Sequence, residues 1–258
     1  MSFFAKLGEY EPCGMFGIEH FILLTLTVVG IIVALHFTAH KNKSEVKEII
    51  KKCTLVLWVL EIIKIIFNLA TGNAKNPNTY VPLYFCSLVL YAGLLSSFAD
   101  GILKKVGDLF LATGGVVAGL VFIISPLTSL TNYPLFHFIS VQSFVLHGIM
   151  IYIGLLINKT KYIEYDFKDM KYYFNFIVLF GVVALIVNKF LGTNLMFVSN
   201  NYPGTFIEII YKMMGRFFST FMIISQATLP YIFVMIVKKM MNKRNEKYID
   251  ENSVTLVR

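Results

Sequence analysis

The stretch FHFISVQSFVLHGIMIYIGLLI, residues 136–157, contains no Lys, Arg, Asp or Glu. A helix of this length rises by roughly 33 Å, which is enough to cross a hydrocarbon core of about 30 Å. Its composition therefore predicts a membrane-spanning helix. One histidine, His147, falls near its middle. Polar groups at such a depth tend to face a protein interior or a wet cavity.

The same apolar character extends along the whole chain. Hydrophobic residues make up 57% of the sequence and the mean hydropathy is +0.69, whereas soluble domains contain roughly 45–50% apolar residues. We therefore predict an all-α, polytopic membrane protein, with one seven-helix domain over residues 1–240 and a polar cytosolic tail over 241–258. The seven predicted spans lie near residues 19–38, 54–71, 81–98, 106–125, 136–157, 172–191 and 215–237.

Lysine and arginine predict the orientation, since cytosolic loops carry an excess of both. Of the 23 Lys and Arg residues, 17 fall in alternate loops and the tail, and 4 fall on the other side. This places the N-terminus outside, the C-terminus in the cytosol, and the protein in the plasma membrane. Topology and contact with anionic lipid explain the net charge of +8, so a nucleic-acid partner is not needed. The oligomeric state is left open.

The second predicted span contains two charged residues, Glu61 and Lys64. They are three residues apart and so share a helix face. Isolated charges are disfavoured at that depth, so we expect each to pair with the other or with a partner across the bundle. The pair fits a proton relay, an anchor for a polar substrate, or a structural ion pair that fixes helix packing.

The third predicted span contains a thiol, Cys86, in VPLYFCSLVLY (81–91). Free cysteine in an apolar segment is usually a small hydrophobe, but a nearby imidazole makes it a candidate nucleophile. On upright helices, Cys86 and His147 differ in depth by about 8 Å, whereas a reacting pair lies about 3 Å apart. Side-chain reach, helix tilt or an unwound start at Pro82 must close that gap. His137, closer to Cys86 in depth, is the fallback base.

Further polar residues lie toward the outer side. The loop at 192–206 contains Asn194 and the apolar run 195–198, which predicts either a loop that dips into the membrane edge or a plain surface loop. Arg216 stands at the outer end of the last span. Gln226 lies four residues before Pro230, which indicates a kink with polar groups inside or a hydrogen-bonded packing node. No cofactor motif and no metal-ligand spacing is present.

Several of these segments resemble one known family in order and spacing. VPLYFC (81–86) is similar to the PLHLC motif of YwaF-like bacterial membrane proteins, which are related to the eukaryotic transmembrane protein 164 family. SP at 125–126, YPLFHF at 133–138 and LHG at 146–148 also fit. LGTNLMFVSNNYP (191–203) resembles the family's G-x-N-Y-M-F segment before a proline. The resemblance covers about residues 55 to 237.

The resemblance implies a lipid acyltransferase. In such an enzyme a membrane cysteine takes an acyl chain from a phospholipid and passes it to a lysolipid. Cys86 would then be the nucleophile and His147 its base, with phospholipid and lysolipid as partners and no cofactor. The chain departs from the pattern at two positions: Tyr84 replaces the usual motif histidine, and Leu195 replaces a frequent tyrosine.

Three hypotheses follow for the function. The first is the acyltransferase, in which a cation such as Lys64 or Arg216 holds a lipid phosphate. The second is a transporter or channel that uses Glu61, Lys64 and His147 as a polar pathway. The third is a structural or regulatory membrane protein whose polar residues fix helix packing.

Overall fold

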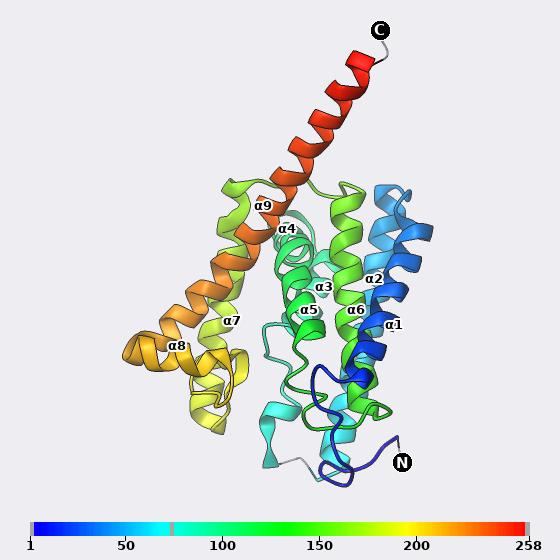
Figure 1. Cartoon of the computed structure of the whole chain (residues 1–258). Coiled ribbons are helices and arrows are strands. Elements are labelled where there is room, and N and C mark those ends of the chain that lie inside the picture. Colours follow the sequence, from blue (N-terminus) through cyan, green and yellow to red (C-terminus); the bar gives the residue numbers. More distant parts are fainter. Residues whose placement is uncertain (1–2, 73–74, 256–258) are drawn as a thin grey trace.

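The structure is a computed structural model that describes residues 3–72 and 75–255, with side chains described up to residue 244. Within these residues all regular structure is helical, and the helices form an upright bundle (Figure 1). Six helical segments of this part are long and apolar enough to cross a membrane. The chain is therefore an all-helical, multi-pass membrane protein, as predicted. The count of seven crossings stays a prediction, because the helix Leu88–Phe98 has 11 residues and rises only about 16 Å.

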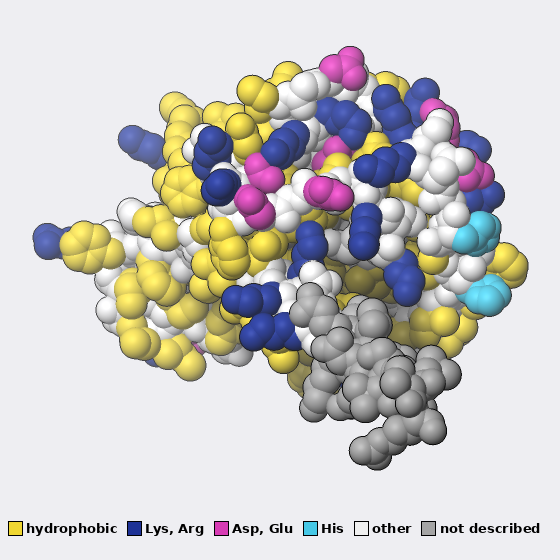
Figure 2. All heavy atoms as spheres, turned by 90° about the horizontal axis from the view of Figure 1, so that it is seen from above, with side chains coloured by type: hydrophobic (Ala, Val, Ile, Leu, Met, Phe, Trp, Pro, Cys, Tyr) yellow, Lys and Arg dark blue, Asp and Glu magenta, His cyan; other side chains and the backbone are white. Residues whose placement is uncertain are grey.

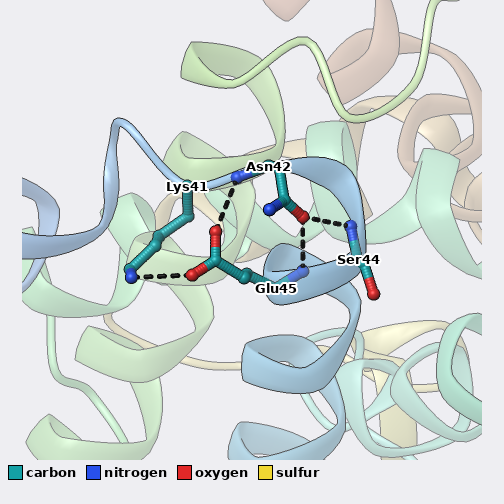
Figure 3. A network of polar contacts seen from close by, with 4 residues as sticks. All are labelled: Lys41, Asn42, Ser44 and Glu45. Carbon is teal, nitrogen blue, oxygen red and sulfur yellow. Dashed lines mark hydrogen bonds and ion pairs between the residues drawn. The ribbon is translucent and has the colours of Figure 1, made fainter.

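The first two helices, α1 (Ile18–Thr38) and α2 (Lys43–Ala70), form a hairpin. α2 begins eleven residues before the predicted span at 54 because a capping box starts it at Asn42 (Figure 3). The Asn42 side chain accepts the backbone N–H groups of Ser44 and Glu45, at 2.9 and 3.0 Å. Glu45 in turn accepts the Asn42 N–H at 3.0 Å. Such a cap stabilises a helix start by about 1 kcal/mol.

The third helix, α3 (Leu88–Phe98), is shorter than the predicted span 81–98. The 3₁₀ turn η2 (Pro77–Thr79) precedes it, and residues 81–87 form bends and turns rather than helix. Pro82 restricts Val81, the residue before it, to extended conformations, so the helix cannot include Val81. Cys86 therefore lies in a turn ahead of α3 and not inside a helix, which corrects the expectation from the sequence.

The fourth predicted span, 106–125, consists of three consecutive pieces over residues 101–124. These are α4 (Gly101–Phe110), the π-helical turn η3 (Leu111–Gly115) and α5 (Val116–Ile124). At the π-turn, the Asn158 side chain donates to the carbonyl oxygens of Ala112 and Gly154, both at 2.8 Å. The Tyr165 hydroxyl donates to Asn158 Oδ1 at 2.6 Å. A hydrogen bond from Asn158 of α6 to Ala112 thus accompanies the π-helical turn, which is wider than an α-helical turn.

Helix α6 (Phe138–Lys159) is the central helix of the bundle. In its apolar window 72% of the residues are buried, against 6% in α1. Glycines let its neighbours approach closely, as is common between membrane helices. A Cβ on Gly154 would come within 2.5 Å of the Leu111 carbonyl oxygen, and a Cβ on Gly119 within 2.5 Å of the Ile151 side chain.

The C-terminal part packs against the bundle through α7 (Met170–Leu191), which follows the short turn η4 (Phe167–Asp169). After η5 (Leu195–Phe197) come α8 (Phe206–Met214), η6 (Gly215–Phe217) and the long α9 (Phe218–Thr255). Pro230 lies inside α9. The backbone of the predicted tail, 241–258, continues α9 up to Thr255; residues 256–258 and the side chains from 245 onward lie outside the described residues.

One end of the bundle is rich in lysine (Figure 2). It carries the connections from α1 to α2, from α3 to α4 and from α6 to α7 (Figure 1). Ion pairs join Lys104 to Asp108 at 2.5 Å and Lys105 to Asp169 at 2.6 Å. The loops that the sequence places in the cytosol therefore share one face, which we call the lysine-rich face. The side of the membrane that this face occupies stays a prediction.

Candidate functional site

His147 on α6 has one free nitrogen inside the protein. Its side chain is 5% exposed, and Nδ1 lies 2.7 Å from the carbonyl oxygen of Ser143, one turn earlier. Because a carbonyl can only accept, Nδ1 carries a proton and donates it. Nε2 is buried and has no hydrogen-bond partner among the described residues. The ring also stacks on Phe122 of α5, with centroids 3.6 Å apart and planes at 7°.

This arrangement fits a proton acceptor. In the neutral ring, a protonated Nδ1 leaves the Nε2 lone pair available. The Ser143 carbonyl and the Phe122 ring fix the direction in which that lone pair points. Sequence reasoning did not identify these two supporting groups, although the i, i+4 spacing of Ser143 and His147 was visible.

Glu61 and Lys64 pair with each other on α2. The Lys64 Nζ lies 2.7 Å from Glu61 Oε1, and the Glu61 side chain is 1% exposed while the Lys64 side chain is 21% exposed. The carboxylate is thus enclosed, while the ammonium group retains some access. Trp58, one turn before Glu61, donates its indole N–H to the Leu90 carbonyl of α3 at 3.1 Å, which joins α2 to α3 beside the ion pair.

Cys86 lies beside this charged pair. The residue as a whole is partly exposed, while its thiol is buried and has the Ser87 hydroxyl within hydrogen-bonding reach. Both Lys64 and Glu61 are close enough to act electrostatically on Cys86, and Lys64 also acts on His147. The predicted thiol, imidazole and ion pair, on the turn before α3, α6 and α2, therefore lie within electrostatic range of Lys64.

The thiol and the imidazole do not form a hydrogen bond in this conformation, since His147 Nε2 has no partner. Of the three ways in which the sequence allowed the two groups to approach, the structure shows the unwound start at Pro82. A turn is less constrained than a helix, because few backbone hydrogen bonds fix its position.

His137, the predicted fallback base, has no free nitrogen. Its Nδ1 accepts the backbone N–H of Ile139 at 3.1 Å, and its Nε2 donates to the Ala5 carbonyl at 3.0 Å. Burial lowers the pKa of His137, while the hydrogen bond to Ala5 opposes that shift. The ring thus caps α6 and attaches the N-terminal segment to it.

The loop after α7 packs its apolar side chains into the protein interior. Leu195, Met196 and Val198 are fully buried, so the apolar run packs inside the protein rather than lying on a surface or in the membrane edge. The side chain of Asn194 accepts the N–H groups of Ser199 and Asn200 at 3.1 and 3.0 Å. Gln226 of α9 donates to the Met196 carbonyl at 2.9 Å. Both residues therefore hold this loop in place.

Tyr84 and Arg216 lie at the margin of the cluster. The Tyr84 hydroxyl donates to Asn78 Oδ1 at 3.4 Å and its ring contacts Phe197, with centroids 5.2 Å apart. It thereby joins the turn that carries Cys86 to the loop after α7. Arg216 is exposed between α8 and α9, and its guanidinium group lies 4.8 Å from the centre of the Phe217 ring.

Two further buried residues were missed as functional candidates. Gln142 of α6 is 3% exposed and its Nε2 has no partner in the described part of the chain. Asn188 of α7 is 4% exposed and makes four hydrogen bonds to the loop after α7. Within the described residues, no three His, Cys, Asp or Glu side chains are grouped to hold a metal ion.

Comparison with known proteins identifies one family. The sequence model of the TMEM164 family matches residues 15–240, which includes every helix described above except the end of α9. No curated protein and no solved structure matches the chain.

Proposed function

Because the chain belongs to the TMEM164 family, we propose that it is a membrane-embedded lipid acyltransferase. Cys86 carries the acyl group as a thioester, and His147 moves the proton. A phospholipid is the donor and a lysolipid the acceptor. The observation that carries this assignment is the His147 ring, which is buried, held at Nδ1 by the Ser143 carbonyl and free at Nε2.

The first half of the reaction loads the cysteine. His147 Nε2 takes the thiol proton, and the sulfur of Cys86 attacks the ester carbonyl carbon of the donor. The ester C–O bond breaks, and the departing lysolipid oxygen takes the proton from His147. The products of this half-reaction are an acyl-thioester on Cys86 and a free lysolipid.

The second half of the reaction transfers the acyl group from Cys86 to the acceptor lysolipid. The hydroxyl group of an acceptor lysolipid gives its proton to His147 and attacks the thioester carbonyl carbon. The C–S bond breaks, the new ester forms, and the sulfur recovers the proton from His147. The energy of the original ester bond is conserved in the thioester, so no cofactor is required.

The surrounding charges support this chemistry. A thiolate needs a cationic or hydrogen-bonding neighbour, and in this proposal Lys64 supplies the cation and Ser87 the hydrogen bond. The Lys64 side chain, which is 21% exposed, also contacts a lipid phosphate in this proposal. Arg216, exposed at the start of α9, is a second phosphate contact in this proposal. His137, Asn194 and Gln226 give polar support by fixing the N-terminal segment and the loop after α7.

The reaction requires the thiol to reach His147 Nε2. The non-helical segment 81–87 is the part that moves in this proposal, because Cys86 lies on a turn while His147 is fixed on α6, in which 72% of the apolar window is buried. The protein crosses the plasma membrane seven times, with the N-terminus outside and the lysine-rich face in the cytosol. The site then lies in the outer half of the bundle, since α6 begins at the outer end.

One observation favours a second function. A buried ion pair such as Glu61–Lys64 is a recurrent element of ion and proton pathways. A transporter or channel that uses this pair with His147 predicts that Glu61→Gln abolishes flux and that Cys86→Ala is tolerated. The acyltransferase predicts that Cys86 is indispensable.

Intact mass spectrometry of the purified protein in lipid tests the assignment. After incubation with a donor phospholipid, we expect an acyl adduct that hydroxylamine removes. The adduct should be absent in Cys86→Ser and form more slowly in His147→Gln. Cys53→Ser, which removes a partly buried thiol from α2, is the matched control and should leave the adduct unchanged. No adduct with several donors, on protein that elutes as a single folded species, contradicts the proposal and directs attention to flux assays.

A further inference from the structure

An apolar groove lies between α1 and α6, on the lipid-facing side of the bundle. Its volume is about 350 Å³, and its walls include Thr27, Gly30 and Ala34 from α1 and Phe144, Gly148 and Tyr152 from α6. No charged side chain lines it. The two helices lie side by side over this region (Figure 1).

The two helices contact each other at several levels along the groove, and one position between two of these contacts is open. A Cβ on Gly148 would come within 2.9 Å of the Thr27 methyl group, so the backbones are close there. Toward the lysine-rich face, the Tyr152 hydroxyl donates to Thr38 Oγ1 at 3.0 Å. Between these levels, an added Cβ on Gly30 would meet nothing within 4 Å. The groove walls extend on α1 from Leu23 to Ala34, about 16 Å along the helix.

We propose that this groove binds one hydrocarbon chain of a membrane lipid. An apolar cavity does not attract water, and α1 is almost entirely surrounded by the bilayer, since only 6% of its apolar window is buried. The material next to the groove is therefore hydrocarbon. The groove follows α1 and α6, so a hydrocarbon chain aligned with these helices matches the length of its walls.

This binding site is separate from the cluster around Lys64 and does not depend on the proposed reaction. His147 precedes Gly148 by one residue, which turns its side chain about 100° away from the groove. The two sites share one element, Phe144, which lines the groove and contacts Phe122 with ring centroids 5.5 Å apart. Phe122 is the ring that stacks on His147, so a chain in the groove contacts the far end of this aromatic series.

Photo-crosslinking tests the proposal directly. The full chain would be placed in nanodiscs that contain a phospholipid with a diazirine in its acyl chain, and the labelled peptides would be mapped by mass spectrometry. We expect labels concentrated on the groove walls of α1 and α6. Gly30→Leu fills the groove without a clash and should reduce that labelling about tenfold, because it takes the place of roughly two methylene contacts.

Two control variants separate filling from other effects. Gly30→Ala changes helix propensity while filling little of the groove and should retain most of the labelling. Val33→Leu adds bulk on the exposed side of α1, where Val33 is 49% exposed, and should leave the labelling unchanged. Uniform labels over all exposed residues, unaffected by Gly30→Leu, would overturn the proposal. Labels on other exposed residues but none on the groove walls would also overturn it, because the occupant would then not be a lipid chain.

Discussion

Replacing Asn188 with alanine should release the loop after α7. Asn188 is 4% exposed, and both polar atoms of its side-chain amide form hydrogen bonds. Its Nδ2 donates to the Leu195 carbonyl at 3.1 Å and to the Ser199 hydroxyl at 2.7 Å. Its Oδ1 accepts the Thr193 hydroxyl at 2.7 Å and the Leu195 N–H at 2.8 Å. One side chain thus replaces the backbone partners that this irregular segment lacks.

The expected loss follows from that count. Each neutral hydrogen bond contributes about 1 kcal/mol net to stability, and a buried group left without a partner costs at least as much. Four bonds therefore correspond to about 4 kcal/mol. A chain of this size loses roughly 2–4 °C of thermal midpoint per kcal/mol, so Asn188→Ala should lower the midpoint by about 8–16 °C.

Thermal unfolding in detergent, followed by the reactivity of the free cysteines with a fluorogenic maleimide, measures this shift. Asn201→Ala in the same loop is the control, because Asn201 Oδ1 has no hydrogen-bond partner among the described residues and the variant loses only the contact with Glu208; the midpoint should fall much less than in Asn188→Ala. Limited proteolysis should also cut Asn188→Ala between residues 192 and 205 before the wild type. A midpoint within about 2 °C of the wild type would show that the loop does not depend on these bonds, and the reasoning would be wrong.

Three other perturbations test separate parts of the structure. Glu61→Gln leaves the Lys64 ammonium without its counter-charge and should be strongly destabilising; a thermal midpoint equal to that of the wild type would refute a tight ion pair. Gly154→Ala forces a Cβ against the Leu111 backbone and should cost about 1–3 kcal/mol, measured by the same thermal assay against Gly30→Ala, which meets no neighbour. Burial lowers the pKa of His137 in the folded state. Its contribution to the free energy of unfolding should therefore be complete above the unfolded-state pKa of about 6.5 and decline as the pH falls below that value. Thermal midpoints at pH 7 and pH 5 should differ less in His137→Gln than in the wild type, and an equal difference would contradict this role.

The sequence predicts the parts of the fold that depend on hydropathy alone. Long apolar runs such as 136–157 match the helix α6 within two residues at each end. Local signals that were visible but not used explain some errors: Asn42 and Glu45 form the capping box of α2, and Thr205 caps the unpredicted helix α8. The capping residues therefore predict where both helices, α2 and α8, begin.

Other features depend on tertiary contacts and were not accessible from the sequence. The π-turn at 111–115 accompanies a bond from Asn158, which lies 46 residues from its acceptor Ala112. The left-handed backbone of Met196, with φ of 55°, occurs in a residue that rarely adopts it. The contacts around it, from Asn188 and Gln226, come from two different helices. No periodic pattern in the sequence predicts these contacts between separate helices and the loop.

The histidines show how the candidate site can be recognised once hydrogen bonds are known. His20 accepts the Phe16 N–H at Nδ1 and bonds to the Ile123 carbonyl through Nε2, and His137 is likewise bonded at both nitrogens. Such rings fix the backbone and have no remaining capacity for chemistry. Only His147 among these three buried rings retains an unpartnered nitrogen, and a buried polar atom without a partner costs about 1–3 kcal/mol. A substrate or a mobile thiol that satisfies Nε2 removes that cost. Hydrogen-bond accounting therefore selects His147 where residue type and depth in the membrane alone left two histidines open.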